Sequence, residues 1–294
     1  MHLEEITIIG AGLLGGSLGL AIRQRQLSVK VRAFVRRPES VAECQRLGVA
    51  HVATQNMKEA VSRADLVILC TPLSQMRELA LQMRPFLKPG AVVTDVGSVK
   101  AGVAQELEPL LREVRAWFVG SHPMAGSEKT GLAAARADLF NNAICLVTPT
   151  PQSPAAAVGA VQDFWKALGG WPVRMTPELH DELVSRSSHL PHVVAAELAN
   201  YVLSPAHPRE QALVCASGFR DTTRIAASSP EMWRDVALAN RKNLGRVLGV
   251  FVADLQEFQL ALEREDVAAI EEFFTKAQER REQWRAHSAT MSPE

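Results

Sequence analysis

The chain has 294 residues, of which 47% are hydrophobic and 22% charged, so it can bury one large core or two ordinary ones. Its 32 basic and 32 acidic side chains cancel, which leaves no net charge to attract nucleic acid or an anionic membrane. No apolar run reaches the ~18 residues of a membrane span, and the four cysteines form no C-x-x-C pair. These features predict a cytoplasmic protein with structural thiols and no nucleic-acid or membrane partner.

The first half alternates apolar strands with helices. Strands are expected at residues 6–9, 29–35, 64–70, 91–96, 117–120, 143–147 and 171–175. Helices are expected after the first strand and at about 38–47, 73–87, 100–114 and 154–168. This alternation is typical of a doubly wound, mainly parallel sheet. We therefore predict an α/β fold of the Rossmann type, with a dinucleotide-binding domain over residues 1–175.

The pattern changes after residue 175. Thr176 followed by Pro177 is a favourable helix start, because it combines a capping side chain with proline at the first helical position. Helical spacing then continues to about residue 283. It includes an apolar stripe spaced by three or four residues: Leu244, Val247, Leu248, Phe251, Leu255, Phe258 and Leu262. We predict an all-α domain over residues 176–294 that forms a homodimer; a self-contained bundle is the alternative.

A glycine-rich loop separates the first expected strand from the first helix. Gly10, Gly12 and Gly15 have the spacing G-x-G-x-x-G. In that motif the glycines permit a tight turn, close approach of a pyrophosphate, and close packing of helix on strand. The N-terminus of the helix then binds the phosphates. The loop predicts a dinucleotide site that includes Leu13 and Leu14; the alternative is a tight turn without a ligand.

The residues after the second expected strand bear on which dinucleotide binds. An NAD-specific site has an acidic residue there, about 20 residues past the glycines, to bind the ribose hydroxyls. This chain has Arg36 and Arg37, followed by Ser40, and paired guanidinium groups suit a 2′-phosphate. The pattern favours NADP, with NAD as the second choice and solvated surface arginines as the alternative reading. Thr71 and Pro72, after the third strand, are expected to line the same site.

Polar side chains also follow the next two strands. Ser98 comes after the strand at 91–96, and His122 comes after the strand at 117–120. Both are expected at the carboxyl edge of the sheet, where Rossmann enzymes bind their ligands. Imidazole is suited to removing a hydroxyl proton near neutral pH, so we predict that His122 is a general base. A plain helix cap is the alternative role for Ser98.

The helical half contains two further polar clusters. His189 and His192 lie three residues apart, on one helix face, and Pro191 is expected to kink that helix. Since no third or fourth ligand accompanies the two histidines, we predict no metal site. Arg224 suits a carboxylate ligand, with a surface ion pair to Asp221 as the alternative.

Together these segments resemble the prephenate/arogenate dehydrogenase family of tyrosine biosynthesis. The matching motifs occur in the order of the family and cover about residues 5–285: GAGLLGGSLGLA, TPLSQ, TDVGSVK, GSHPMAGSEKTG, SHLPH, GFRDTTRIA and MWRD. The succession of DVGSVK, HPMAG and HLPH is not shared by Rossmann enzymes at large.

The resemblance implies oxidative decarboxylation of arogenate or prephenate, with hydride transfer to the nicotinamide, giving tyrosine or 4-hydroxyphenylpyruvate. It implies that His122 accepts the proton of the ring hydroxyl and that Ser98 bonds both this hydroxyl and His122. It also implies six substrate-site residues: His189, His192, Arg224, Glu128, Lys129 and Trp233. Of these, Trp233 is expected to reach the site of a neighbouring subunit.

Several alternatives stay open at this point. The substrates differ in whether the side chain is a keto acid or an amino acid, and use of NADP favours arogenate, or both substrates, by analogy alone. A β-hydroxyacid dehydrogenase is a rival enzyme class, but the segment Arg241–Asn243 lacks the glycines of its lysine motif and His122 would stay unexplained. An NADP(H)-binding redox sensor is the non-enzymatic alternative.

Overall fold

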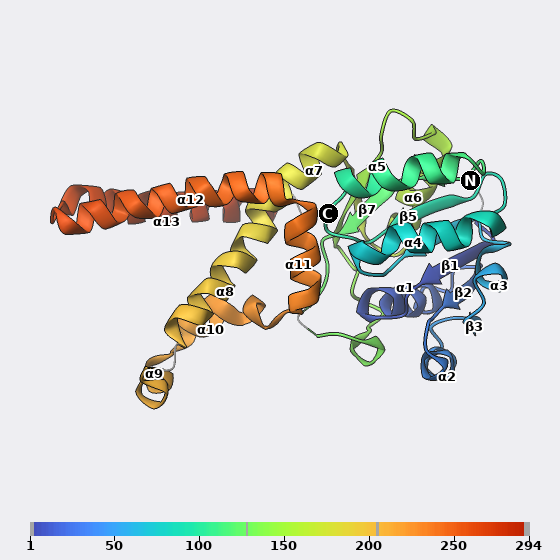
Figure 1. Cartoon of the computed structure of the whole chain (residues 1–294), viewed down its shortest axis with the longest axis horizontal. Coiled ribbons are helices and arrows are strands. Elements are labelled where there is room, and N and C mark those ends of the chain that lie inside the picture. Colours follow the sequence, from blue (N-terminus) through green and yellow to red (C-terminus); the bar gives the residue numbers. More distant parts are fainter. Residues whose placement is uncertain (1–2, 128, 204–205, 291–294) are drawn as a thin grey trace. The chain divides into compact units, whose positions relative to one another are not determined.

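The computed structural model describes residues 3–127, 129–203 and 206–290, with side chains up to residue 287. The chain forms two compact units, Met1–Asn243 and Leu244–Glu294 (Figure 1). The first unit holds both β-sheets and the candidate site. Within the described ranges, no helix is long and apolar enough to cross a membrane.

The larger sheet is parallel throughout and has six strands. Their order across the sheet is β3 (Val52–Thr54), β2 (Lys30–Phe34), β1 (Glu5–Ile9), β4 (Leu66–Leu69), β5 (Val92–Asp95) and β6 (Trp117–Phe118). The chain winds outward from β1 in both directions, so the strand order reverses between β1 and β4. Such a switch point is where open α/β sheets bind ligands. The predicted α/β class is confirmed.

Both faces of this sheet are buried, which explains its continuous apolar strands. In β4, Leu66 and Ile68 pack on one face, against α1 (Leu13–Gln24) and α6 (Ala155–Ala167). The alternating residues Val67 and Leu69 pack on the other face, against α3 (Met57–Val61), α4 (Leu73–Met83) and α5 (Ala101–Arg112). At the sheet edge, α2 (Pro38–Leu47) ends where predicted, because Gly48 adopts the left-handed conformation, with φ of 67°.

A second, three-stranded sheet contains β7 (Gly120–Pro123), β8 (Ile144–Thr148) and β9 (Trp171–Arg174). Here β7 is antiparallel to β8, and β8 is parallel to β9. The prediction of one strand at 117–120 is therefore wrong. Those residues divide between β6 and β7, because Ser121 bonds the end of β5 and draws the chain away from the first sheet.

Helices follow β9 in the first unit, in the order α7 (Pro177–Val184), α8 (Leu190–Val202), α9 (Pro208–Val214), α10 (Ser217–Thr223) and α11 (Pro230–Ala239). The predicted start of α7 is confirmed, since the Thr176 hydroxyl accepts a hydrogen bond from the Leu179 N–H at 3.2 Å. Before α8 a π-helix spans Ser185–His189. Pro191 lacks an N–H and lies in the first turn of α8, so the helix is widened ahead of the proline rather than kinked inside one α-helix.

The second unit is built from α12 (Arg241–Glu263), which begins at the end of the first unit, and α13 (Val267–Thr290). Phe258 packs on Phe273, with ring centroids 4.5 Å apart. The predicted stripe lies on α12, but Leu255 is 46% exposed and Leu262 52% exposed in the single chain. An apolar surface of this kind is typical of a protein interface.

Candidate active site

The glycine loop has the geometry that its spacing predicts. Gly10 has a φ of +94°, and a Cβ atom there would lie 2.6 Å from the Cys70 carbonyl oxygen. A Cβ at Gly15 would lie 2.0 Å from the carbonyl oxygen of Gly10, so neither position admits a side chain. At Gly12, by contrast, a Cβ would meet no described atom within 4 Å. The loop therefore leaves open space beside the start of α1.

Hydrogen-bond donors border that space. Gly12 is the N-cap of α1 and, among the described residues, no side chain caps this helix, so its first N–H groups are available to a phosphate. Leu13 and Leu14 form the first turn, and Pro72 begins α4 nearby. The Thr71 hydroxyl is buried and has no hydrogen-bond partner within the described chain. A buried hydroxyl in that state is unfavourable unless a ligand bonds it, so these groups fit a dinucleotide.

The end of β2 lies next to the loop. The Gly10 N–H donates to the Phe34 carbonyl oxygen at 3.0 Å. The chain that leaves β2 then carries Arg36 and Arg37, both exposed, and Ser40, which is half-buried in the first turn of α2. Two exposed cationic side chains thus follow directly from a strand that borders the cofactor loop.

A buried ion pair joins the end of β5 to the start of α5 and is hydrogen-bonded to the start of β7. The Lys100 ammonium contacts the Asp95 carboxylate, and both side chains are fully buried. Lys100 Nζ also donates to the Ser121 carbonyl oxygen at 2.9 Å, while the Ser121 N–H donates to Asp95 Oδ1 at 3.2 Å. The Ser121 hydroxyl donates to the Asp95 carbonyl oxygen at 2.7 Å. These bonds hold the residue before His122 at the carboxyl edge of the parallel sheet.

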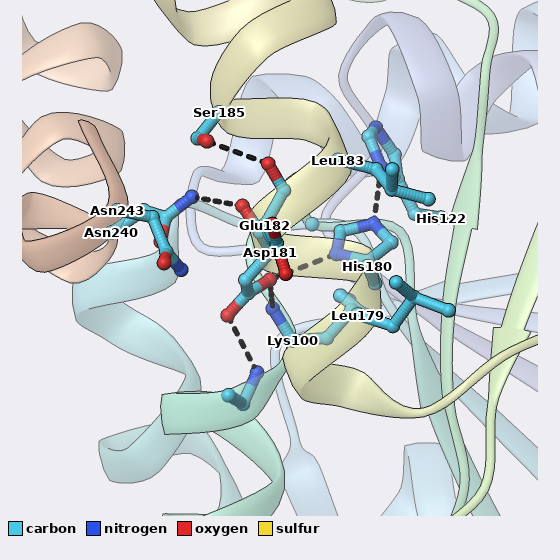
Figure 2. A network of polar contacts seen from close by, with 12 residues as sticks. Lys100, His122, Leu179, His180, Asp181, Glu182, Leu183, Ser185, Asn240 and Asn243 are labelled. Atoms are coloured by element: carbon cyan, nitrogen blue, oxygen red, sulfur yellow. Dashed lines mark hydrogen bonds and ion pairs between the residues drawn. The ribbon is translucent and has the colours of Figure 1, made fainter. Parts of the chain in front are cut away.

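His122 is half-buried and is hydrogen-bonded to a second histidine. Its Nδ1 lies 2.9 Å from Nε2 of His180 on α7, and Nδ1 of His180 lies 2.8 Å from Oδ1 of Asp181 (Figure 2). Burial lowers the pKa of His122 well below its usual value, and the neighbouring His180 and Lys100 lower it further. His122 is therefore neutral near pH 7, the form that a general base needs.

His189, the last residue of the π-helix, is connected to the His122–His180 pair through Asn240 and Asp181. His189 is fully buried, and its Nδ1 lies 3.2 Å from Nδ2 of Asn240, which also donates to the carbonyl oxygen of Asp181 at 2.8 Å. An amide N–H faces the ring nitrogen, so the neutral imidazole is favoured. Burial lowers the pKa of His189 to about 4, although Asp181 and the backbone of Ser98 partly offset this effect.

This shift predicts that the protein loses stability in mild acid. The unfolded chain binds a proton at His189 below about pH 6.5, whereas the folded chain does so only near pH 4. The free energy of unfolding should therefore fall as the pH is lowered through this window, by up to about 3 kcal/mol for His189. The lowered pKa values of His122 and His180 act in the same direction. Urea denaturation at neutral and mildly acid pH measures the loss.

The same denaturation series on two variants shows which histidine causes the loss of stability in mild acid. A His189→Gln variant should show a shallower pH dependence than the wild type. A His207→Gln variant should match the wild type, because His207 is exposed. Equal slopes for all three proteins would contradict the assignment to His189.

A second cluster contains His192, Trp233 and Arg224. The His192 and Trp233 rings are stacked, with centroids 3.7 Å apart and an interplanar angle of 26°. Burial lowers the pKa of His192, and the positive charge of Arg224 adds to this effect. The indole Nε1 of Trp233 is buried with no hydrogen-bond partner in the described residues. A cation beside a buried N–H donor suits an anionic ligand.

The two clusters are neighbours within the first unit. The His189 ring lies 5.9 Å from the Trp233 ring, and its charge, when present, lowers the pKa of His122. Trp233 belongs to the same chain as His192. The expectation that Trp233 reaches the site of a neighbouring subunit is not tested by a single chain and stays a prediction.

Three other predicted residues have no side-chain contact with His122 or His192 among the described hydrogen bonds, or lie outside the described residues. The described hydrogen bond of His122 is with His180 rather than with Ser98, whose backbone instead contacts His189. Lys129 is exposed, and its N–H donates to the Ser127 hydroxyl at 3.1 Å in the loop after β7. Glu128 lies outside the described residues.

Sequence reasoning missed four polar residues that organise the site: Lys100, His180, Asp181 and Asn240. One signal was present in the sequence. His180 and Asp181 are adjacent in the expected helix after Thr176, and two polar side chains there could have been expected to bond other parts of the site. Charged residues are rarely buried without a partner. No sequence pattern says which of the eight histidines such a pair meets.

Comparisons with known proteins agree with this architecture. Residues 18–173 match the family model of the prephenate dehydrogenase nucleotide-binding domain, and residues 176–276 match that of the prephenate dehydrogenase dimerisation domain. The chain is 35% identical over 280 residues to a cyclohexadienyl dehydrogenase of Zymomonas mobilis, covering 95% of each chain. It is 34% identical over 288 residues to a prephenate dehydrogenase of Bacillus subtilis, covering 95% of this chain and 76% of that one.

A solved structure agrees at the level of the whole chain. Prephenate dehydrogenase from Aquifex aeolicus, in complex with hydroxyphenyl propionate and NAD+, has a TM-score of 0.89 and 31% identity over 96% of this chain and 99% of that one. A nicotinamide dinucleotide is thus bound by a relative of the same fold. With the glycine loop, the buried histidines and both domain types in place, the chain belongs to the prephenate dehydrogenase family and is a dehydrogenase with a nicotinamide dinucleotide cofactor.

Proposed function

We propose that the protein oxidatively decarboxylates a cyclohexadienol, with arogenate as the favoured substrate and prephenate as the second. The observation that carries the proposal is the neutral, half-buried His122, which lies next to the residue that bonds the end of β5 at the carboxyl edge of the Rossmann sheet. Relatives named cyclohexadienyl, prephenate and arogenate dehydrogenases support this substrate class, the last being a Synechocystis structure with a TM-score of 0.81 and 26% identity over 95% of this chain.

The reaction needs a base at one end of the ring and an anion site at the other. His122 accepts the proton of the ring hydroxyl, so that a carbonyl forms at the carbon that loses hydride. The bound dinucleotide supplies the hydride acceptor. The bond to the ring carboxylate then breaks, CO₂ leaves, and the electron pair passes through the ring to the carbonyl oxygen, which takes the proton back from His122 to give an aromatic phenol. Aromatisation favours this step, so no acid is needed to expel CO₂.

The remaining site residues position the substrate in this proposal. Arg224 binds a substrate carboxylate, and His189, His192 and Trp233 line the pocket. Ser98 hydrogen-bonds the reacting hydroxyl and, because Nδ1 of His122 is bonded to His180, meets His122 at Nε2. Lys129, in the loop after β7, contacts the substrate; Glu128, which lies outside the described residues, is assigned to substrate binding from the resemblance alone.

A direct assay tests the proposal. The purified protein is mixed with NADP and with arogenate, prephenate or a 3-hydroxy acid, and the absorbance of the reduced cofactor is followed. We expect turnover with the two cyclohexadienols and none with the 3-hydroxy acid. Absence of turnover with both cyclohexadienols, using either NADP or NAD, would overturn the proposal.

NADP is the cofactor in this proposal, because two exposed arginines follow β2 where an NAD-specific sheet has a carboxylate. Replacing Arg36 and Arg37 together by alanine should raise KM for NADP roughly 10-fold or more and change KM for NAD little, since only NADP has the charged 2′-phosphate. Steady-state kinetics with each cofactor measure both values. Arg46→Ala, on an exposed turn of α2, is the matched control. An unchanged KM for NADP in the double variant would contradict the assignment.

We also propose that the working protein is a homodimer formed through the helices after residue 175, with the functional boundary between residues 1–175 and 176–294. Its support is the match of residues 176–276 to a dimerisation domain and the exposed apolar side chains of α12 and α13, which include Leu255, Phe274 and Trp284. Analytical ultracentrifugation should give twice the mass of the chain at micromolar concentration. A monomer would contradict the proposal.

A further inference from the structure

We infer that His180 and Asp181 form a relay that fixes the tautomer of His122, leaving its Nε2 as the proton acceptor. The inference rests on the proposed function in one respect, since it takes His122 as the base. The relay itself stands on the geometry of three buried or half-buried side chains from β7 and α7 (Figure 2).

The chain of hydrogen bonds begins at Asp181. Its side chain is buried, with 3% of the residue exposed, and both oxygens accept backbone N–H groups at the start of α5. Lys100 N–H donates to Oδ1 at 2.7 Å, and Ala101 N–H donates to Oδ2 at 2.9 Å. With donors on both oxygens, the ionised form is the one that fits, and an ionised carboxylate can only accept hydrogen bonds. Nδ1 of His180 must therefore donate its proton to Asp181.

This donor fixes the rest of the relay. A neutral imidazole with its proton on Nδ1 has a lone pair on Nε2. In His180 that nitrogen faces Nδ1 of His122 at 2.9 Å, so Nδ1 of His122 carries the proton and donates it to His180. The one remaining nitrogen of His122, Nε2, then has a lone pair. A base needs this lone pair on the nitrogen that faces the substrate hydroxyl.

The surroundings hold His180 in place and disfavour other states. The His180 ring is fully buried, and burial lowers its pKa, so it stays neutral in spite of Asp181. The backbone of Asp181 is fixed by the Asn240 side chain. The ammonium of buried Lys100 adds a charge that opposes protonation of both rings. In the opposite arrangement, Asp181 would be protonated and would donate its proton to Nδ1 of His180. The proton would then lie on an oxygen that already accepts a backbone N–H at the start of α5.

Three substitutions separate a relay from a merely structural pair. Asp181→Asn removes the carboxylate charge, and its one amide oxygen cannot accept both the N–H groups of α5 and the proton of His180, so the relay is weakened. His180→Leu removes the relay at similar volume. His180→Gln keeps one acceptor for His122 and one donor for Asp181. We expect kcat to fall roughly 100-fold or more in the first two variants, with KM within about twofold, and to be largely restored in His180→Gln.

Nitrogen-15 NMR of labelled histidines tests the same relay without turnover. Two-bond hydrogen–nitrogen couplings identify which ring nitrogen carries the proton, and the His122 signals are assigned by their loss in a His122→Asn variant. We expect a proton on Nδ1 of His122 in the wild type and loss of this preference in His180→Leu, which has no acceptor for that N–H. A wild-type proton on Nε2, or the same tautomer in both proteins, would overturn the relay. An inactive wild type that shows the expected tautomers would overturn the proposed function and leave the relay supported.

The kinetic outcomes are equally decisive. If His180→Gln loses as much kcat as His180→Leu, the residue is needed for packing and the relay is wrong. If all three variants keep the wild-type kcat, the relay is also wrong. Melting temperatures of the variants show whether each protein is folded at the assay temperature.

Discussion

Replacing His122 by asparagine should lower kcat roughly 100-fold or more, while KM for the cyclohexadienol changes little. Asparagine has similar size and can hydrogen-bond His180, but it cannot take a proton from the ring hydroxyl. The oxidation must then proceed from the neutral alcohol, in which hydride loss leaves a protonated carbonyl of higher energy. Initial rates at saturating NADP, over a range of arogenate or prephenate concentrations, give kcat and KM separately.

The control for this variant is another histidine on the same protein. His207 is exposed and precedes α9, so His207→Asn should keep the wild-type kcat and KM. Binding of the cofactor to His122→Asn, followed by fluorescence, should also be unchanged, because the glycine loop and Thr71 are intact. Near-normal turnover by His122→Asn would remove His122 from the role of base.

The second large effect concerns stability. Replacing Lys100 by methionine should lower the free energy of unfolding by about 3–5 kcal/mol, because it leaves the Asp95 carboxylate buried without its partner. Both side chains are fully buried, and Lys100 also bonds the Ser121 carbonyl oxygen. Loss of this bond should loosen β7 as well. Urea denaturation of the purified protein measures the change.

Two comparisons isolate the uncompensated charge. Lys88→Met breaks the ion pair of Lys88 with Asp65, in which the lysine side chain is 40% exposed, and should cost about 1 kcal/mol or less. The double variant Lys100→Met with Asp95→Asn removes the buried charge, so it should recover part of the stability lost in Lys100→Met. If Lys100→Met is no more destabilising than Lys88→Met, the buried pair does not hold β7 to β5.

The sequence predicted helix ends correctly where glycine, proline or a capping hydroxyl directly favours the start or the end of a helix. Gly48 ends α2 in the left-handed conformation, and Thr176 with Pro177 begins α7. The helices and strands without such signals were harder to predict. The three-residue strand β3 (Val52–Thr54) and the short helix α3 (Met57–Val61) were missed, because neither spans enough residues to show a periodic pattern.

The sequence by itself determined the Rossmann class and the dinucleotide loop, since each depends on neighbours a few residues apart. It placed His122 after a strand, whereas His122 lies within β7 of the second sheet. Only the tertiary structure decided what His122 meets. Its partner His180 is 58 residues away, and Asn240 reaches His189 across 51 residues. These contacts depend on how β7 leaves the first sheet and how α7 packs on α5. Buried hydrogen bonds between distant residues have no period or spacing, so only the packed chain shows which donor meets which acceptor.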